Sequence, residues 1–582
     1  MRFNIGSIHD FQLTHGQRKF SPDRRLPAHG QSLAREPKRP AMWRQLTLGA
    51  ILLGVAACSP FSSKDAGQQQ RGTIGFVKGF IGGVAADEPR AVLIGRNVLS
   101  AGGSATDAAV AVYFALSVTL PSSASLGGGG VCLVRDHKTN TVETLDFSAR
   151  VPKGAVPVGK TAVAIPGNPL GFYALHTKYG RLKWAELIRP AENLARFGNE
   201  VSRALGQDLI LTGNKLLSHQ DSREIFALTD GQSLLQEGEF LKQTELSGTL
   251  ARIRSLGGAR LYSGPFGREF VAAVDAAGGA MNYEDLRAFR PLWRPTLSVS
   301  WVQETAFHFP SPPGSAGATA AQMAAMLRYK DLFETSDEGT RIHLLAEAAE
   351  RSLADRRNWD GSTGTNVAAN QLATPERAGR LMRTFNKNRR VVTAGAVAAG
   401  LDPTSQSSGT SFSIMDREGS AVACSLSMNK PFGNGLVARG TGVVLAAPPE
   451  PNTGAASLAS VILVSKIRNA VYYVSSASGG ALAPTSLINV AAYSLSDSNI
   501  TLEKAIKRKR VHHGGADGIT YLESGTPNAV VDGLKKRGHK LAFVNSMGSV
   551  NAVLCTNGIP HEKINCSAFT DPRGSGLALS TQ

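Results

Sequence analysis

The strand-like segments of this chain gather in one region, and helical patterns lie on both sides of it. Short β-patterned segments follow one another over residues 411–475, and the turn at 416–419 joins the first two as a hairpin. Apolar residues at helical spacing mark segments on either side of this region. Strands in one region with helices around them predict a layered α/β fold. No repeat of about 20 to 50 residues indicates a solenoid.

The pattern predicts individual elements as well as the fold class. The expected helices are 107–116, 182–197, 246–256, 342–354, 487–495 and 502–509. The expected strands are 411–415, 421–428, 442–445, 459–464 and 470–475.

Composition excludes several classes of protein. The 582 residues are 42% hydrophobic, which is enough to bury a large core and excludes a disordered chain. The formal net charge is +18, and residues 1–41 carry five of those charges. The densest basic run, Lys504 with 507–510, is expected to be a solvated helix face. Without zinc-finger spacing or a phosphate-binding loop, the sequence indicates no nucleic-acid partner.

A targeting signal stands near the start. The apolar run 46–57 (LTLGAILLGVAA) follows Arg44 and ends at Cys58, and it is too short to span a bilayer. The residues VAAC resemble a bacterial lipobox, whose cysteine is lipidated. We therefore expect an exported lipoprotein on the periplasmic face of a membrane. A plain signal peptide with an incidental cysteine is the alternative.

The N-terminal organisation follows from this signal. Residues 1–41 are a basic leader, or a mis-assigned start if translation begins at Met42. Residues 42–58 form the lipoprotein-type signal. The polar stretch 59–73 is expected to be a flexible tether.

The remaining cysteines lack metal-type spacing. Cys132 and Cys424 lie in apolar strand-like runs and are interpreted as small buried hydrophobes. Cys555 and Cys566 are close enough in sequence to form a disulfide in an oxidising periplasm, and the sequence leaves that pairing open.

Residues 102–136, GGSATDAAVAVYFALSVTLPSSASLGGGGVCLVRD, resemble the gamma-glutamyltransferase family in their helix start and their glycine run before a strand. The resemblance continues in family order at 145–147, 165–167, 179–184, 261–264, 312–314, 347, 355–356, 419–422, 429, 432–433, 478–480 and 510–513. It implies a four-layer αββα sandwich of the N-terminal-nucleophile hydrolase type. It also implies a precursor that cuts itself before a threonine, giving a large-subunit-like region 74–409 and a small-subunit-like region 410–582.

The resemblance places the cut between Gly409 and Thr410. A threonine hydroxyl is a weak nucleophile, but an N-terminal threonine has its own α-amine as a base. An ungapped alignment on the hairpin puts Gly409 at the nucleophile position and Thr410 next to it. Since neighbouring strand residues face opposite ways, Thr410 matches the family only if one residue is deleted between it and Ser413.

The other site residues also come from the resemblance. Gly479 and Gly480 match the family's oxyanion hole, where backbone N–H groups face developing negative charge. Arg150 and Asn429 are candidates to orient the substrate, although Ser148 occupies the usual arginine position. In 446–451, which replaces the segment that usually grips the donor amine, Glu450 offers the one carboxylate. A structural arginine, a turn asparagine and an exposed glutamate are the alternatives.

The sequence thus predicts a gamma-glutamyltransferase-like enzyme that hydrolyses or transfers an acyl group, such as gamma-glutamyl, from an amide such as glutathione. Its expected partners are a small amide or peptide substrate, the two fragments of its own precursor and a membrane lipid. No metal or cofactor is implied. The alternative is a catalytically inactive family member that serves as a lipid-anchored binding or structural protein.

Overall fold

The computed structural model describes residues 82–359, 367–393, 395, 409–449, 458–496, 500–562 and 564–581. The predicted leader, signal and tether, with Cys58, lie outside these residues, as does Glu450. In the described part of the chain, no helix combines the length and the apolar character needed to cross a membrane.

One antiparallel sheet carries the predicted hairpin. Among the described residues it has seven strands, in the order β22 (Leu577–Ser580), β1 (Gly82–Ala86), β11 (Gly409–Asp416), β12 (Ala421–Ser427), β2 (Gly129–Asp136), β3 (Thr141–Phe147) and β8 (Leu292–Pro295). The hairpin pairs without interruption from Gly409 opposite Ser427 to Met415 opposite Ala421. This confirms the predicted hairpin, whose first strand also begins two residues earlier than expected.

A second antiparallel sheet packs face to face on the first. Over the described segments its order is β21 (Cys566–Phe569), β20 (Ser549–Ile559), β16 (Ala470–Ser478), β15 (Ala459–Ser465), β10 (Thr305–Phe309) and β9 (Leu297–Ser300). Buried apolar side chains from both sheets, including Met415, Ala423, Ile462 and Val553, fill the space between them. Alternate residues of β11 therefore face the second sheet and the helices behind the first.

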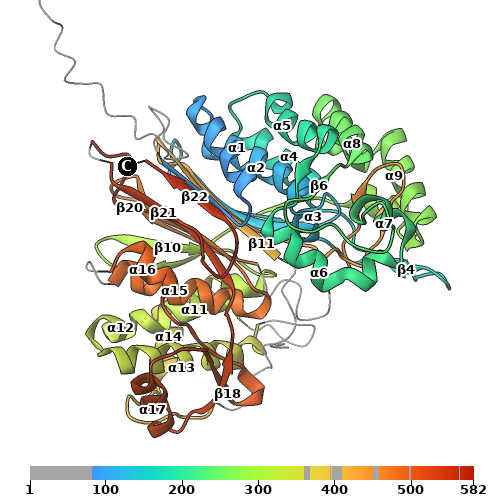
Figure 1. The fold of residues 1–582 in the computed structure, drawn as a ribbon. Helices are drawn as coiled ribbons and strands as arrows, with labels where there is room; N and C mark the ends of the chain where they lie inside the picture. The colour runs from blue at the N-terminus through green and yellow to red at the C-terminus, as the bar shows by residue number, and fades with distance from the viewer. Residues whose placement is uncertain are drawn as a thin grey trace, which may run out of the picture. The chain divides into compact units, whose positions relative to one another are not determined.

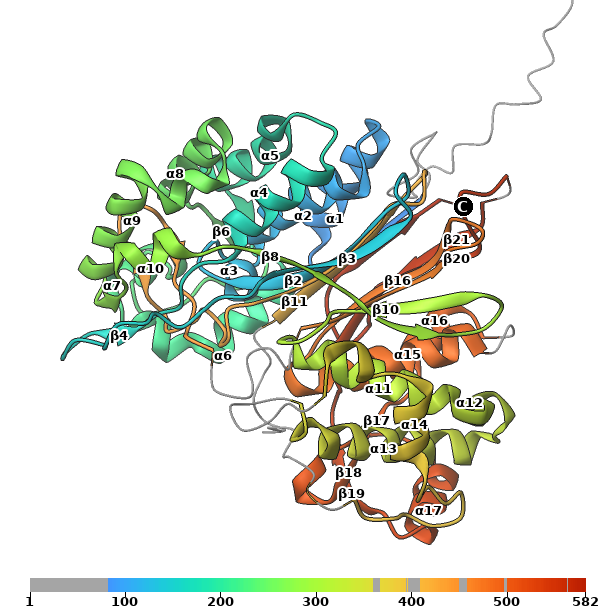
Figure 2. The ribbon, with the colours of Figure 1, turned by 180° about the vertical axis from the view of Figure 1, so that it is seen from behind.

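Helices cover the outer face of each sheet (Figures 1 and 2). On the first sheet lie α1 (Pro89–Ser100), α2 (Ala105–Thr119) and α4 (Asn168–Tyr179), with α5 (Trp184–Phe197) and α8 (Thr244–Leu256) behind them. On the second lie α11 (Ser315–Arg328) and α15 (Ala483–Ser496), with α13 (Glu338–Arg356) behind. The predicted four-layer αββα sandwich is confirmed.

The remaining elements lie around these layers. They include α3 (Pro121–Ala124), α6 (Arg203–Leu217), α7 (Gln220–Phe226), α9 (Gly264–Ala276), α10 (Tyr283–Ala288), α12 (Leu332–Thr335), α14 (Pro375–Met382), α16 (Leu502–Lys507) and α17 (Asn528–Lys536). A small sheet joins β17 (Val511–His513), β18 (Ile519–Glu523) and β19 (Lys540–Val544). Two-stranded pairs join β13 (Val437–Ala438) to β14 (Val443–Val444), β4 (Thr161–Ala162) to β7 (Gly279–Ala280) and β5 (Asn199–Glu200) to β6 (Phe240–Leu241).

Helix α2 shows how the sequence sets an element. Ser104 and Asp107 form a reciprocal capping box, which satisfies free backbone N–H groups at the helix start. The helix is rich in alanine and valine, and every residue of it is buried. The predicted helix 107–116 is therefore confirmed, and it begins earlier because the cap fixes its start.

The cysteines differ in part from expectation. Cys132 and Cys424 are buried as predicted, but they form a disulfide because they lie opposite each other on β2 and β12. The sequence analysis predicted their burial but not this pairing. Cys555 and Cys566 also form a disulfide, which closes the pairing that the sequence left open.

The basic run near the C-terminus is only partly a solvated face. Helix α16 ends at Lys507, which pairs with Glu503 on the surface. Arg510 is only 2% exposed and forms an ion pair with Asp571. The prediction was wrong for Arg510, because the chain turns inward there to start β17 at Val511.

Candidate active site

Thr410 lies at the start of β11, where the end of β1 meets it. Ala86, the last residue of β1, pairs with Phe412, so the next residue, Asp87, lies beside Ser411. The Thr410 hydroxyl donates a hydrogen bond to Asp87 Oδ2 at 2.9 Å, and the Ser411 backbone N–H donates to the same oxygen at 2.9 Å. Thr410 is 1% exposed, so its hydroxyl depends on this carboxylate for a partner.

The Asp87 carboxylate joins the two sheets. Its Oδ1 accepts hydrogen bonds from Asn551 Nδ2 at 2.8 Å and from Ser549 Oγ at 3.1 Å, both on β20. Burial raises the pKa of Asp87, and the hydrogen bonds it accepts oppose that rise. The sequence reasoning missed Asp87 because its partners are more than 300 residues away along the chain, and its one signal is an acid directly after a strand.

The predicted oxyanion segment lies close to this carboxylate. Ser478 Oγ lies 3.5 Å from Asp87 Oδ2, and Gly479 and Gly480 follow it directly. Both glycines have positive φ, +131° and +60°, which favours glycine. Gly480 begins a short 3₁₀ turn that leads into α15. Backbone N–H groups at such a helical start favour negative charge. Ser478 and Thr410 both lie at Asp87 Oδ2, which places the start of this segment near Thr410.

A buried ion pair stabilises the backbone that packs against the predicted oxyanion segment. A Cβ at Gly479 would lie 2.4 Å from Gly548 Cα, so these two backbones are in close contact. Arg510 Nη1 donates to the Met547 carbonyl at 2.6 Å and to the Gly548 carbonyl at 3.1 Å. Asp571 holds Arg510 in place and also accepts the Val550 N–H at 3.0 Å. The backbone beneath Gly479 is therefore fixed by charged hydrogen bonds.

The hairpin pairs without a bulge from Gly409 to Met415, so successive side chains of β11 alternate regularly between its two faces. Thr410 shares a strand face with Phe412, whose side chain is in the core under the first helical layer. Ser411 and Ser413 face the second sheet, where Ser413 Oγ contacts Ser476 Oγ at 2.9 Å. Gly409, rather than Thr410, falls on the face of Ser413. The Thr410 hydroxyl is linked to the second sheet through Asp87, which accepts hydrogen bonds from Thr410 and from Asn551 on β20.

Backbone carbonyls accept hydrogen bonds from both predicted substrate residues that the structure describes. Arg150 donates to the Arg290 carbonyl at 3.2 Å and lies 5.0 Å from the centre of the Phe289 ring. Asn429 has a φ of +61° and donates from Nδ2 to the Ala447 carbonyl at 2.7 Å, which is the turn role left open as an alternative. Asn429 follows two residues after Ser427, which pairs with Gly409, so it lies at the same end of the hairpin as Thr410.

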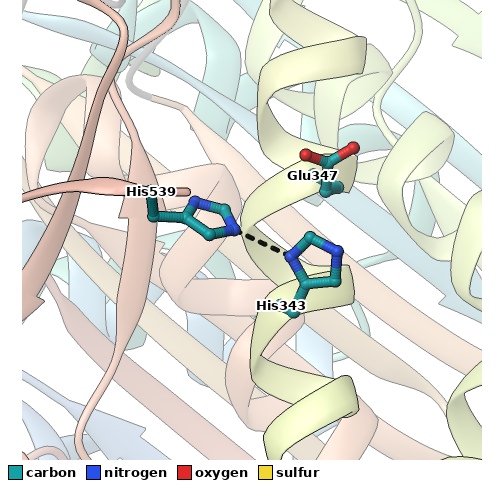
Figure 3. Close-up of side chains that lie close together, drawn as sticks. All are labelled: His343, Glu347 and His539. Carbon is teal, nitrogen blue, oxygen red and sulfur yellow. Dashed lines mark hydrogen bonds between the residues drawn. The ribbon is translucent and has the colours of Figure 1, made fainter. Parts of the chain in front are cut away.

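A second cluster of chemically capable side chains lies in the other helical layer (Figure 3). His343 and Glu347 are one turn apart on α13, and His539 directly precedes β19. His343 Nδ1 and His539 Nε2 are 2.7 Å apart, and Glu347 accepts from Arg351 at 2.7 Å. The three could hold a metal ion by residue type and proximity.

Hydrogen bonds already account for this cluster. His343 Nε2 faces the Asn386 carbonyl at 2.9 Å and must donate to it, which leaves Nδ1 as an acceptor. His539 Nε2 then donates to it, and His539 Nδ1 accepts from the Thr520 hydroxyl at 2.8 Å. A metal ion would have to displace the proton in the hydrogen bond between His539 Nε2 and His343 Nδ1. We interpret the cluster as a link between α13 and the small sheet.

This link predicts a pH-dependent stability. Burial lowers the pKa of His539 from 6.5 to about 3, so the unfolded chain takes up its proton first as the pH falls. Its stabilising contribution is complete above pH 6.5 and is lost as the pH falls toward 3. Between pH 7 and 5, we expect the wild type to lose about 2 kcal/mol more unfolding free energy than His539→Gln. Urea titrations at both pH values measure this, and equal losses would contradict it.

Comparison with known proteins places the chain in a family. The gamma-glutamyltranspeptidase family model matches residues 91–448 and 449–581. The glutathione hydrolase proenzyme of Escherichia coli is 27% identical over 565 residues, covering 89% of this chain and 96% of the relative. That of Pseudomonas aeruginosa is 28% identical over 597 residues, covering 93% and 99%.

A solved structure agrees on the fold. Cephalosporin acylase from Bacillus halodurans superposes with a TM-score of 0.73 at 22% identity, covering 86% of this chain and 96% of the acylase. Because the family model matches residues 91–448 and 449–581, the chain belongs to the gamma-glutamyltranspeptidase family.

Proposed function

We propose that this protein hydrolyses or transfers an acyl group from an amide, using Thr410 as a nucleophile that self-cleavage between Gly409 and Thr410 makes N-terminal. The observation that carries the proposal is the hydrogen bond from the Thr410 hydroxyl to the buried Asp87 carboxylate, beside the Ser478 that opens the oxyanion segment. The relatives described as glutathione hydrolase proenzymes support a processed precursor and glutathione-like amides as the first substrates to test.

The proposed chemistry uses two acyl transfers at one oxygen. In the precursor, Thr410 Oγ attacks the Gly409 carbonyl, and water hydrolyses the resulting ester. The freed α-amine then serves as the base when Thr410 Oγ attacks the substrate amide. Backbone N–H groups at Gly479 and Gly480 stabilise the negative oxygen, and the acyl group leaves to water or to an amine.

Self-cleavage tests the proposal directly. The purified full-length chain, reduced and run on a denaturing gel, should give two fragments whose intact masses meet between Gly409 and Thr410. Thr410→Ala should leave one chain, because it removes the attacking oxygen. Ser411→Ala is the matched control, since it removes a neighbouring hydroxyl and should still be cut. An uncut wild type, or a cut Thr410→Ala, would refute Thr410 as the nucleophile.

The hairpin register supports a second candidate function. Thr410 is 1% exposed and lies on the helix-facing side of β11, while Gly409 holds the face of Ser413. A member of the family with this arrangement could act as a binding or structural protein without catalysis. It would remain one folded chain and release no product from glutathione or a chromogenic gamma-glutamyl anilide. The same gel and these two substrates separate the candidates.

We also propose that the protein is exported and anchored through a lipid on Cys58, with the catalytic body in the periplasm. The support is the apolar run 46–57 and the lipobox-like residues that end at Cys58. Cells given labelled palmitate should label the wild type and leave Cys58→Ala unlabelled. Label on Cys58→Ala would contradict the anchor. Arg150, Asn429 and Glu450 remain candidates for substrate contact.

A further inference from the structure

The first step of self-cleavage lacks the base that the mature enzyme would use. Before the cut, the Thr410 nitrogen belongs to the peptide bond with Gly409 and has no free lone pair to take a proton. The attacking hydroxyl therefore needs another acceptor. In the structure, that hydroxyl donates to Asp87 Oδ2 at 2.9 Å.

We propose that Asp87 is the general base of the self-cleavage step, an inference that rests on the proposed function. As Thr410 Oγ attacks the Gly409 carbonyl carbon, the hydroxyl proton moves to Asp87 Oδ2. The carbon–nitrogen bond then breaks, and Asp87 returns the proton to the leaving nitrogen. An ester joins Gly409 to Thr410 Oγ, and water hydrolyses it to a carboxylate and a free hydroxyl.

The geometry of this step is local to one residue. Thr410 Oγ and the Gly409 carbonyl close a five-membered ring during the attack. The step therefore does not depend on which sheet face carries Thr410, so the hairpin register does not prevent it. The position of the base relative to the hydroxyl is what matters, and β1 fixes that position by its pairing with β11.

The surroundings of Asp87 suit a base. Asn551 and Ser549 hold Oδ1, which leaves Oδ2 to the Thr410 hydroxyl and the Ser411 N–H. Burial raises the pKa of Asp87, so its ionised carboxylate is a stronger base than that of an exposed aspartate.

The charged groups nearby are committed to other partners. Glu88 turns to the Ala91 N–H and the Thr119 hydroxyl, and Asp208 on α6 accepts from Ser122. Asp571 is paired with Arg510. Among the described residues, Asp87 is the carboxylate that touches the Thr410 hydroxyl.

The test follows cleavage of newly made chain in time. Full-length protein from cell-free synthesis is pulse-labelled, and fragment formation is measured for the wild type and Asp87→Asn. Asparagine keeps the size of the side chain but cannot accept the proton as a carboxylate does. We expect cleavage to slow by at least about 100-fold. Asp208→Asn is the matched control, because it makes the same change at a nearby carboxylate that is held by Ser122 and does not touch the Thr410 hydroxyl. It should cleave within about tenfold of wild type.

A second measurement, the pH dependence of wild-type cleavage, does not depend on how the variant folds. The wild-type cleavage rate should rise with pH as Asp87 ionises and then level off. The inference would be overturned if Asp87→Asn has a wild-type urea midpoint, which shows that it is folded, and still cleaves at the wild-type rate. A wild-type cleavage rate that does not change with pH would also overturn it. Either result would leave Thr410 as the nucleophile. An uncut wild type would instead refute the proposed function itself.

Discussion

Gly479→Ala should lower kcat for a gamma-glutamyl anilide by at least about 100-fold, the usual effect of losing one oxyanion-hole donor. Gly479 has a φ of +131°, and an added Cβ would lie 2.4 Å from Gly548 Cα. Since backbone cannot move aside as a flexible side chain does, the segment would shift and its N–H groups would leave their positions. The loss should appear in kcat, because the contact forms as the negative oxygen develops.

Gly102→Ala is the matched control for this change. Gly102 also has positive φ, +86°, but an added Cβ there would meet nothing within 4 Å. It should cost about 1 kcal/mol of stability and leave kcat unchanged. Steady-state kinetics and urea unfolding on all three proteins make the comparison. A folded Gly479→Ala with wild-type kcat would show that this segment is not the oxyanion hole.

Asp571→Ala should destabilise the protein by about 3 to 5 kcal/mol, as expected when one member of a buried ion pair is removed. Arg510 is 2% exposed and would remain charged in the interior without its carboxylate. The Val550 N–H would lose its acceptor as well. Because Arg510 holds the Met547 and Gly548 carbonyls beneath Gly479, kcat should fall together with stability.

Glu503→Ala provides the comparison for Asp571→Ala. Glu503 pairs with Lys507 on the surface, with both side chains about half exposed. Its loss should cost no more than about 1 kcal/mol. Urea unfolding of both variants measures the difference. Equal effects would show that the Arg510 ion pair contributes no more than a surface pair.

Much of the fold could be predicted because short-range sequence patterns determine its helices and strands. The hairpin of β11 and β12 follows from alternation and a turn, and α2 follows from its cap and apolar run. The four-layer order came from resemblance, since alternation shows that a strand is buried but not which sheet covers it. Gly479 and Gly480 were also predicted from the resemblance, because their motif is contiguous in the sequence.

The rest of the site depends on contacts between distant parts of the chain. Asp87 meets Asn551 across 464 residues, and no periodicity reports such a pair. Arg510 sits in a basic run whose composition indicates solvent, yet the chain turns it toward Asp571. The strand face that carries Thr410 is known only from the pairing of β11 with β12. Counting residues in the sequence could state two possible faces but could not choose between them.

The disulfide between Cys132 and Cys424 has a consequence for the cut protein. The two cysteines are 292 residues apart, and the bond between Gly409 and Thr410 lies between them. Cleavage there would leave the two polypeptides covalently tethered under oxidising conditions. Dilution could not separate them, their ratio would stay one to one, and unfolded protein could reassemble as a single molecule. Only reduction would turn the pair into two species that can exchange partners.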